Sequence, residues 1–153
     1  MPTRRHVLAS GTHACTAALA SAALPVLSLG GTDTQRFMLI CLTGPDNPSR
    51  ASLLFASAHL LAEANHAVRI DLAGDGTLLI RRGVADELRA PGLPALTDIM
   101  AKAQTQGILI YVCRACAEAR GITNSDLDHR NAQYTNGQAM AAAMEWATKV
   151  LVL

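Results

Sequence analysis

Apolar stretches of strand length alternate with segments of helical spacing over most of the chain. Four mainly apolar stretches have the length of a β-strand: residues 37–42, 67–72, 108–112 and 149–153. The stretch 37–42 is apolar without interruption, as expected for a strand buried on both faces. Three segments have the apolar spacing of helices, 50–65, 94–107 and 137–147, and a short helix is expected to end at Gly121. The segment 77–88 has an ambiguous pattern, and we expect a short helix there that is broken near Gly83. This alternation predicts an α/β domain of three layers, α/β/α, with a mostly parallel sheet of about five strands.

Local residue choices predict where some of these elements begin and which side they bury. Ser49 is expected to cap the first helix, because its hydroxyl can accept a backbone N–H of the first turn. The apolar positions of that helix would share one face: Leu53, Ser57, Leu60, Leu61 and Ala64. The segment 124–136 is polar and without periodicity, so we expect it to be irregular.

Composition narrows the class of protein. Half of the 153 residues are apolar, which excludes a disordered chain. Only 3% are aromatic, so Ala, Leu, Ile and Val must fill the core. The balance of 13 Lys and Arg against 12 Asp and Glu leaves no basic excess to neutralise phosphates. We therefore expect no nucleic-acid partner.

The first thirty residues differ from the rest of the chain. They contain Arg4 and Arg5 but no acidic residue, and the first acid in the sequence is Asp33. A basic start followed by a weakly apolar, Ala- and Leu-rich stretch is the pattern of an export leader, and the twin arginine resembles that of the twin-arginine pathway. We therefore expect an export signal over 1–30, a domain over 31–153 and a periplasmic location, with membrane contact only through the leader. An uncleaved anchor and a cytoplasmic protein are the alternatives.

Three loops follow predicted strands, at 43–48, 74–77 and 113–116. The carboxyl ends of parallel strands meet at one edge of a sheet, and ligands of such sheets bind at that edge. Asp46 and Asp75 lie in the first two loops, where Asp commonly bonds its own backbone but can also serve a site. The sequence therefore predicts the functional site at this edge.

Cys113 and Cys116 are the residues best suited to chemistry in these loops. Cys113 stands where a strand stops and a helix starts, so the helix dipole and free N–H groups would favour its thiolate. Cys116 completes a C-x-x-C pair, the spacing that supports disulfide exchange. Arg114 and Arg120 could add positive potential. Cys41 is expected in the core, and no spacing of Cys and His indicates a metal, so we expect neither metal nor cofactor.

The sequence around this pair resembles the DsrE/DsrF-like family. Four segments carry the resemblance, which extends over residues 37–153: 107–122, 44–51, 74–76 and 149–153. The resemblance implies a three-layer α/β/α domain that assembles into homotrimers or homohexamers. It also implies that sulfur is carried as a persulfide on the strand-end cysteine, which is Cys113 here.

Three hypotheses about function follow from these residues. The first is a thiol-based sulfur-handling protein, a carrier or sulfurtransferase-like enzyme, with a persulfide on Cys113 and Cys116 as the resolving thiol. Its partners would be a sulfur donor or acceptor protein or a small sulfane-sulfur compound. The second is a periplasmic dithiol oxidoreductase. The third is a non-catalytic oligomeric module in which the pair forms a structural disulfide.

Overall fold

Five parallel β-strands form the centre of the domain in a computed structural model that describes residues 33–153. The predicted export signal at 1–30 lies outside the described residues. The strands are β1 (Arg36–Cys41), β2 (Ala67–Leu72), β3 (Leu109–Cys113), β4 (Ala132–Thr135) and β5 (Lys149–Val152). Their order in the sheet is β4-β3-β2-β1-β5, and every neighbouring pair is parallel. The predicted α/β fold with a parallel sheet is confirmed.

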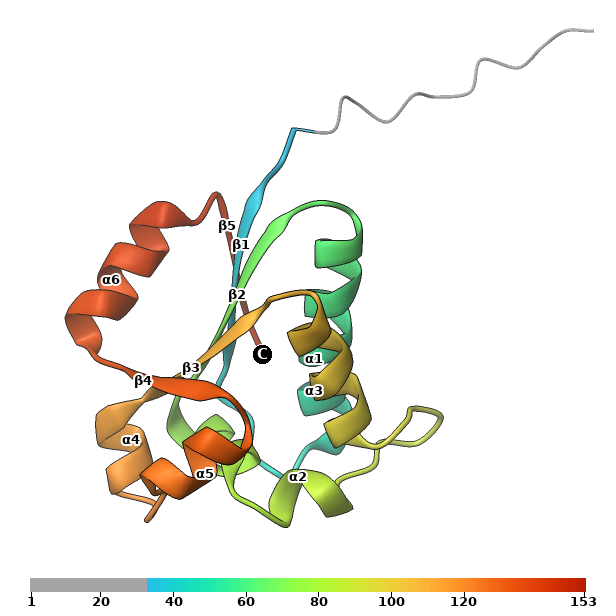
Figure 1. The fold of residues 1–153 in the computed structure, drawn as a ribbon, viewed down its shortest axis with the longest axis vertical. Coiled ribbons are helices and arrows are strands. Elements are labelled where there is room, and N and C mark those ends of the chain that lie inside the picture. Colours follow the sequence, from blue (N-terminus) through green and yellow to red (C-terminus); the bar gives the residue numbers. More distant parts are fainter. Residues whose placement is uncertain (1–32) are drawn as a thin grey trace, which may run out of the picture. The chain divides into compact units, whose positions relative to one another are not determined.

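Helices cover both faces of this sheet (Figure 1). Helices α1 (Pro48–Glu63) and α3 (Leu96–Thr105) pack side by side on one face, and α6 (Gly137–Trp146) lies on the other. Four short helices gather near the end of the sheet where β2 and β3 finish: η1 (Gly74–Ile80), α2 (Val84–Glu87), α4 (Arg114–Glu118) and α5 (Asn124–His129). None of the helices within 33–153 has the length and apolar character needed to span a membrane.

The hydrophobic core lies mainly between the sheet and the α1–α3 layer. Alternate strand residues such as Leu39, Ile70 and Ile110 point into it, because successive side chains of a strand face opposite sides. On the other face, Met38 and Ile40 of β1 pack against α6 in a smaller cluster. Full burial of each large apolar side chain contributes about 1.5 to 3 kcal/mol, so the α1–α3 face supplies most of the stability.

Helix α1 begins two residues earlier than the sequence predicted. Asn47, rather than Ser49, is the N-cap residue, because its side-chain oxygen accepts the N–H of Arg50 at 3.1 Å. Pro48 then occupies the first turn, where its missing N–H costs no hydrogen bond. The prediction of a Ser49 cap was therefore wrong.

The buried face of α1 also differs from the predicted one. Leu53 and Leu60, expected to face inward, are 50% and 61% exposed. The buried positions of the helix are Ala51, Ser52, Leu54, Phe55 and Ala58. Helix α1 packs along both α3 and the sheet, so small residues at the contact allow close approach while Phe55 fills the core.

The segment 124–136 is not irregular, as we expected, but contains α5 and β4. The side chain of Asp126 accepts the backbone N–H of Thr123 at 2.9 Å and starts α5 with a capping box. Strand β4 then pairs with β3 from Ala132 to Thr135. Strand β4 is a short edge strand whose formation depends on this pairing. Its residues are mostly polar and show no apolar periodicity, so the sequence pattern did not reveal it.

The turn after β2 is packed tightly against the end of β1. The N–H of Gly76 donates to the carbonyl oxygen of Leu42 at 3.2 Å. A Cβ atom added at Gly76 would overlap the carbonyl group of Cys41, so only glycine fits at this position. The close approach fixes where the chain lies as it leaves β2.

Replacement of Gly76 by alanine should therefore destabilise the domain. We expect Gly76→Ala to lower the free energy of unfolding by about 2 to 3 kcal/mol, since the new methyl group must displace the end of β1. Gly137→Ala is the matched control, because a Cβ there meets nothing within 4 Å. Its free energy of unfolding should stay within about 1 kcal/mol of the parent. Urea unfolding followed by circular dichroism measures both, and equal stability of the two variants would contradict the close-packing argument.

Candidate functional site: a dithiol at the end of β3

Cys113 and Cys116 lie together where β3 meets α4. Cys113 is the last residue of β3 and the N-cap of α4, and its Sγ accepts the backbone N–H of Cys116 at 3.4 Å. The two Sγ atoms are 2.6 Å apart, with the thiol of Cys113 donating to the sulfur of Cys116. A disulfide, with its bond of about 2.05 Å, requires a further approach of roughly half an ångström. Both residues are partly exposed, so the pair is an accessible dithiol.

The two thiols differ in acidity in the direction opposite to our expectation. Burial, together with the hydrogen bond to Cys116, raises the pKa of Cys113. The hydrogen bond donated by Cys113 lowers the pKa of Cys116, and the Gly74 N–H and the Arg120 guanidinium lower this pKa further against the effect of burial. Helix α4 has only five residues, so its dipole is weak beside these direct contacts. The shifts therefore make Cys116 the more acidic thiol of the pair and Cys113 the less acidic one.

The three loops predicted to converge do so around this pair. The backbone N–H of Gly74, at the start of η1, helps to lower the pKa of Cys116. Asp75 accepts hydrogen bonds from Nε and Nη2 of Arg120 on one carboxylate oxygen, at 3.0 and 2.8 Å. A Cβ atom at Gly44, in the loop after β1, would lie 3.1 Å from the Cβ of Asp75. Loops from β1, β2 and β3 therefore form one continuous site.

Positive charge reaches the dithiol from Arg120 and not from Arg114. Nη1 of Arg120 donates to the carbonyl oxygen of Cys116 at 3.1 Å, which holds the guanidinium beside the pair. The guanidinium of Arg114 instead lies over the ring of Tyr134, 4.2 Å from its centroid, and 3.8 Å from the carboxylate of Glu118. Of the two arginines proposed from the sequence, only Arg120 therefore bears on the sulfur chemistry.

A cleft of about 560 Å³ adjoins the site at the carboxyl ends of β1 and β5. Asp75 lines this cleft and also binds Arg120, so it connects the cleft with the dithiol. Asp46, from the loop after β1, and Arg50, from α1, also line the cleft, so its walls are partly charged. The cysteines do not line this cleft, and Asp75 links it to the dithiol through Arg120.

The sequence reasoning missed an ion pair inside the sheet. Arg69 Nε and Nη2 donate to the two carboxylate oxygens of Asp71 at 2.7 and 2.9 Å, and Asp71 is fully buried. The guanidinium carbon of Arg69 lies 3.7 Å from the centroid of the Tyr111 ring. Charged residues at alternate positions of an otherwise apolar central strand are the signal that could have revealed this pair.

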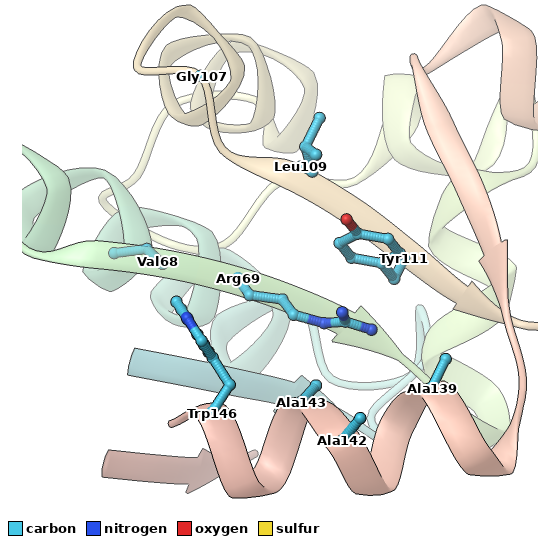
Figure 2. Close-up of a pocket in the computed structure, with 9 residues that line it drawn as sticks. All are labelled: Val68, Arg69, Gly107, Leu109, Tyr111, Ala139, Ala142, Ala143 and Trp146. Atoms are coloured by element: carbon cyan, nitrogen blue, oxygen red, sulfur yellow. The ribbon is translucent and has the colours of Figure 1, made fainter. Parts of the chain in front are cut away.

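Arg69 and Tyr111 belong to a second hollow, of about 480 Å³, on the α6 face of the sheet. Figure 2 shows side chains of β2, β3 and α6 around it, with Trp146 standing at the end of α6. The cysteines do not line this groove. The groove therefore differs from the site at the strand ends.

Cys41 has a structural role, as expected, and two histidines near the end of α1 bond to neighbouring residues. Burial raises the pKa of the Cys41 thiol to about 11, and this thiol donates to the carbonyl oxygen of Thr43 at 3.4 Å. Nε2 of His59 lies 3.4 Å from the carboxylate of Glu63, and Nδ1 of His66 accepts the backbone N–H of Gln35 at 3.2 Å. Among residues 33–153 no three His, Cys, Asp or Glu side chains gather closely enough to hold a metal ion.

The fold and the dithiol together define an α/β thiol protein whose reactive sulfurs lie at a strand end. The chain belongs to the DsrE/DsrF-like family, whose family model matches residues 35–153. The resemblance proposed from the sequence is thereby confirmed. Membership of this family supports a general role in sulfur handling.

One relative is similar in sequence, and two solved structures are similar in fold. The uncharacterized protein MJ0760 of Methanocaldococcus jannaschii is 32% identical over 97 residues, which are 63% of this chain and 35% of that protein. This chain thus spans about a third of the length of that curated relative. The crystal structure of YchN from E. coli matches 78% of this chain and 100% of its own, with a TM-score of 0.63 and 19% identity. BT1422 of Bacteroides thetaiotaomicron, a conserved protein of unknown function, matches 76% of this chain and 94% of its own, with a TM-score of 0.57 and 16% identity. The two structures share the fold.

The different acidities predict an order of alkylation. At pH 7 iodoacetamide should modify Cys116 first, because its lowered pKa leaves more of it as thiolate, and Cys113 more slowly. Cys41 should stay unmodified until the domain is unfolded, because it is buried and its pKa is raised to about 11. Trypsin cuts after Arg114 and so places the two site cysteines in separate peptides for mass spectrometry. Faster modification of Cys113 would reverse the order of acidity.

Proposed function

We propose that the protein handles sulfane sulfur, carried as a persulfide on Cys113, with Cys116 as the resolving thiol. The observation that carries the proposal is the 2.6 Å separation of the two sulfur atoms at an accessible strand end. Membership of the DsrE/DsrF-like family supports the general chemistry. Because Cys116 is the more acidic thiol, its role at loading in this proposal is that of the base that takes the proton of Cys113.

The proposed loading step starts from the form of the pair in which the more acidic Cys116 is the thiolate and Cys113 carries the proton. As the Cys113 sulfur attacks the sulfane sulfur of a donor persulfide RSSH, its proton moves to the adjacent Cys116 thiolate. The donor S–S bond breaks, RS⁻ leaves, and Cys113 carries the persulfide. One sulfur atom is transferred, and no external oxidant or reductant is needed.

Two reactions can then unload the sulfur. An acceptor thiolate can attack the outer sulfur, taking it as a new persulfide and leaving the Cys113 thiolate. Alternatively Cys116, after losing its proton, attacks the inner sulfur, breaks the S–S bond and releases HS⁻. The second reaction reduces the sulfane sulfur to sulfide and oxidises the pair to a disulfide, which a dithiol reductant must reduce again.

Variants of the two cysteines test this assignment. Reduced protein exposed to polysulfide should gain the mass of one sulfur atom per persulfide, measured on the intact chain. Cys113→Ser should lose this gain, whereas Cys116→Ser should load sulfur and hold it longer because the resolving thiol is absent. Loading of Cys113→Ser but not of Cys116→Ser would reverse the roles.

Two further outcomes would favour the other hypotheses. If the parent loads no sulfur but cycles between dithiol and disulfide, the protein is a dithiol oxidoreductase. If the pair stays oxidised in strong reductant, it is a structural disulfide. Both outcomes contradict the persulfide proposal.

Location and assembly complete the proposal. The twin arginine and the acid-free start of the sequence support export to the periplasm, where a donor or acceptor protein or a small sulfane compound would meet the dithiol. Large apolar residues are exposed on α6 and the edge strand β5, including Trp146, Val150 and Val152, which supports self-association.

We expect the domain to form a homotrimer or homohexamer in solution. Pairing or packing of exposed apolar residues on β5 and α6 would remove them from water, which drives association. Light scattering coupled to size-exclusion chromatography measures the mass at micromolar concentration. A stable monomer would contradict the assembly proposal without bearing on the sulfur chemistry.

A further inference from the structure

The turn Gly74–Asp75–Gly76 contacts the dithiol site, although the proposed sulfur steps do not use it. Asp75 is 65% exposed, yet its carboxylate binds Arg120, a residue 45 positions further along the chain. Arg120 is only 29% exposed and is bonded on its other side to the Cys116 carbonyl. Arg120 therefore links the exposed Asp75 to the backbone of Cys116.

We propose that Asp75 is a positioning residue of the dithiol: it holds Arg120 beside Cys116 and offsets the charge of the guanidinium, and so sets the pH range in which the pair reacts. This inference rests on the proposed function, in which the Cys116 thiolate first takes a proton and later resolves the persulfide. Asp75 itself does not touch the sulfur atoms in any of these steps.

The backbone around Asp75 holds the carboxylate in place. Gly76 fits against the Cys41 carbonyl only because it lacks a side chain, and Gly74 has a positive φ of 52°. The backbone N–H of Gly74, in the same turn, helps to lower the pKa of Cys116. One turn thus supplies both a polar group that favours the Cys116 thiolate and the partner of the nearby cation.

The ion pair acts on the sulfurs as a near-neutral unit. A guanidinium alone would stabilise the Cys116 thiolate and any anionic sulfur that replaces it. With the Asp75 carboxylate 2.8 Å from Arg120 Nη2, the two opposite charges largely cancel at a distance. The pair then stabilises the Cys116 thiolate less strongly than a lone guanidinium would, so this thiolate can still take a proton or attack the persulfide.

Other charged groups near the pair are accounted for by their own partners. On α4, Arg114 and Glu118 pair with each other at 3.8 Å and are exposed. Arg81, which follows η1, donates to the backbone carbonyl of Arg120. On β3, the ring of Tyr111 lies under the guanidinium of Arg69. The Asp75–Arg120 pair joins η1 to the end of α4, and its Arg120 also donates to the carbonyl oxygen of Cys116.

The test is the pH profile of Cys116 alkylation in single variants. Asp75→Asn keeps a side-chain oxygen for Arg120 but removes the negative charge, so the midpoint of the profile should move to lower pH. Below the midpoint, the rate should rise about three- to tenfold, since one pH unit corresponds to a factor of ten in thiolate. Arg120→Gln should move the midpoint to higher pH and slow the reaction by a similar factor.

Asp86→Asn is the matched control. Asp86 also binds an arginine of a distant segment, Arg130, at 2.7 Å, but neither residue contacts the cysteines. Its profile should equal that of the parent. Thermal unfolding of each variant verifies the fold, and Arg120→Gln keeps the test decisive if Asp75→Asn does not fold.

The results separate this inference from the proposed function. An unchanged profile in Asp75→Asn, or a shift to higher pH, would overturn the role of Asp75, as would an equal shift in Asp86→Asn. A purely structural Asp75 would change the unfolding temperature without moving the profile. Alkylation needs no sulfur donor, so the role of Asp75 can hold even if the protein loads no persulfide.

Discussion

The dithiol site depends on the contact between Gly76 and the end of β1. This contact places the turn after β2 directly on the carbonyl of Cys41, which belongs to the buried core. The turn in turn carries the Gly74 N–H and the Asp75 carboxylate toward the start of α4. The buried strand β1 thereby sets the positions of Gly74 and Asp75, which lie about forty residues before Cys116 in the sequence.

A second constraint is the number of negative charges that the pair can hold. Two sulfurs 2.6 Å apart cannot both ionise at neutral pH, because the second charge would be repelled by the first. The pair can therefore hold at most one charge, and the surrounding groups decide which sulfur ionises first. The hydrogen bond from Cys113, with Gly74 and Arg120, lowers the pKa of Cys116, whereas burial raises that of Cys113. In the proposed loading step, the more acidic Cys116 would act as the base beside Cys113.

Local patterns in the sequence were enough for four of the five strands and for the cysteine pair. Mainly apolar stretches and the C-x-x-C spacing lie in neighbouring residues, so β1, β2, β3, β5 and the start of α4 could be predicted. Strand β4 and the inner face of α1 depend on contacts with other elements, so local periodicity missed the strand and misplaced the face. The acidity of the two thiols depends on Gly74 and Arg120, and only the fold brings these residues to Cys116.

The buried Arg69–Asp71 pair shows how the α6 face supports the site without lining it. Asp71 is fully buried, and an unpaired carboxylate there would be strongly destabilising, so the two hydrogen bonds from Arg69 are required. Nη2 of Arg69 also donates to the hydroxyl of Thr135 at 3.4 Å, and Thr135 pairs with Cys113 in the register of β3 and β4. The side chain from β2 thus ties β4 across β3 at the point where Cys113 leaves the sheet. Substitutions in this polar cluster would therefore act on the sulfur pair through the position of the strand end.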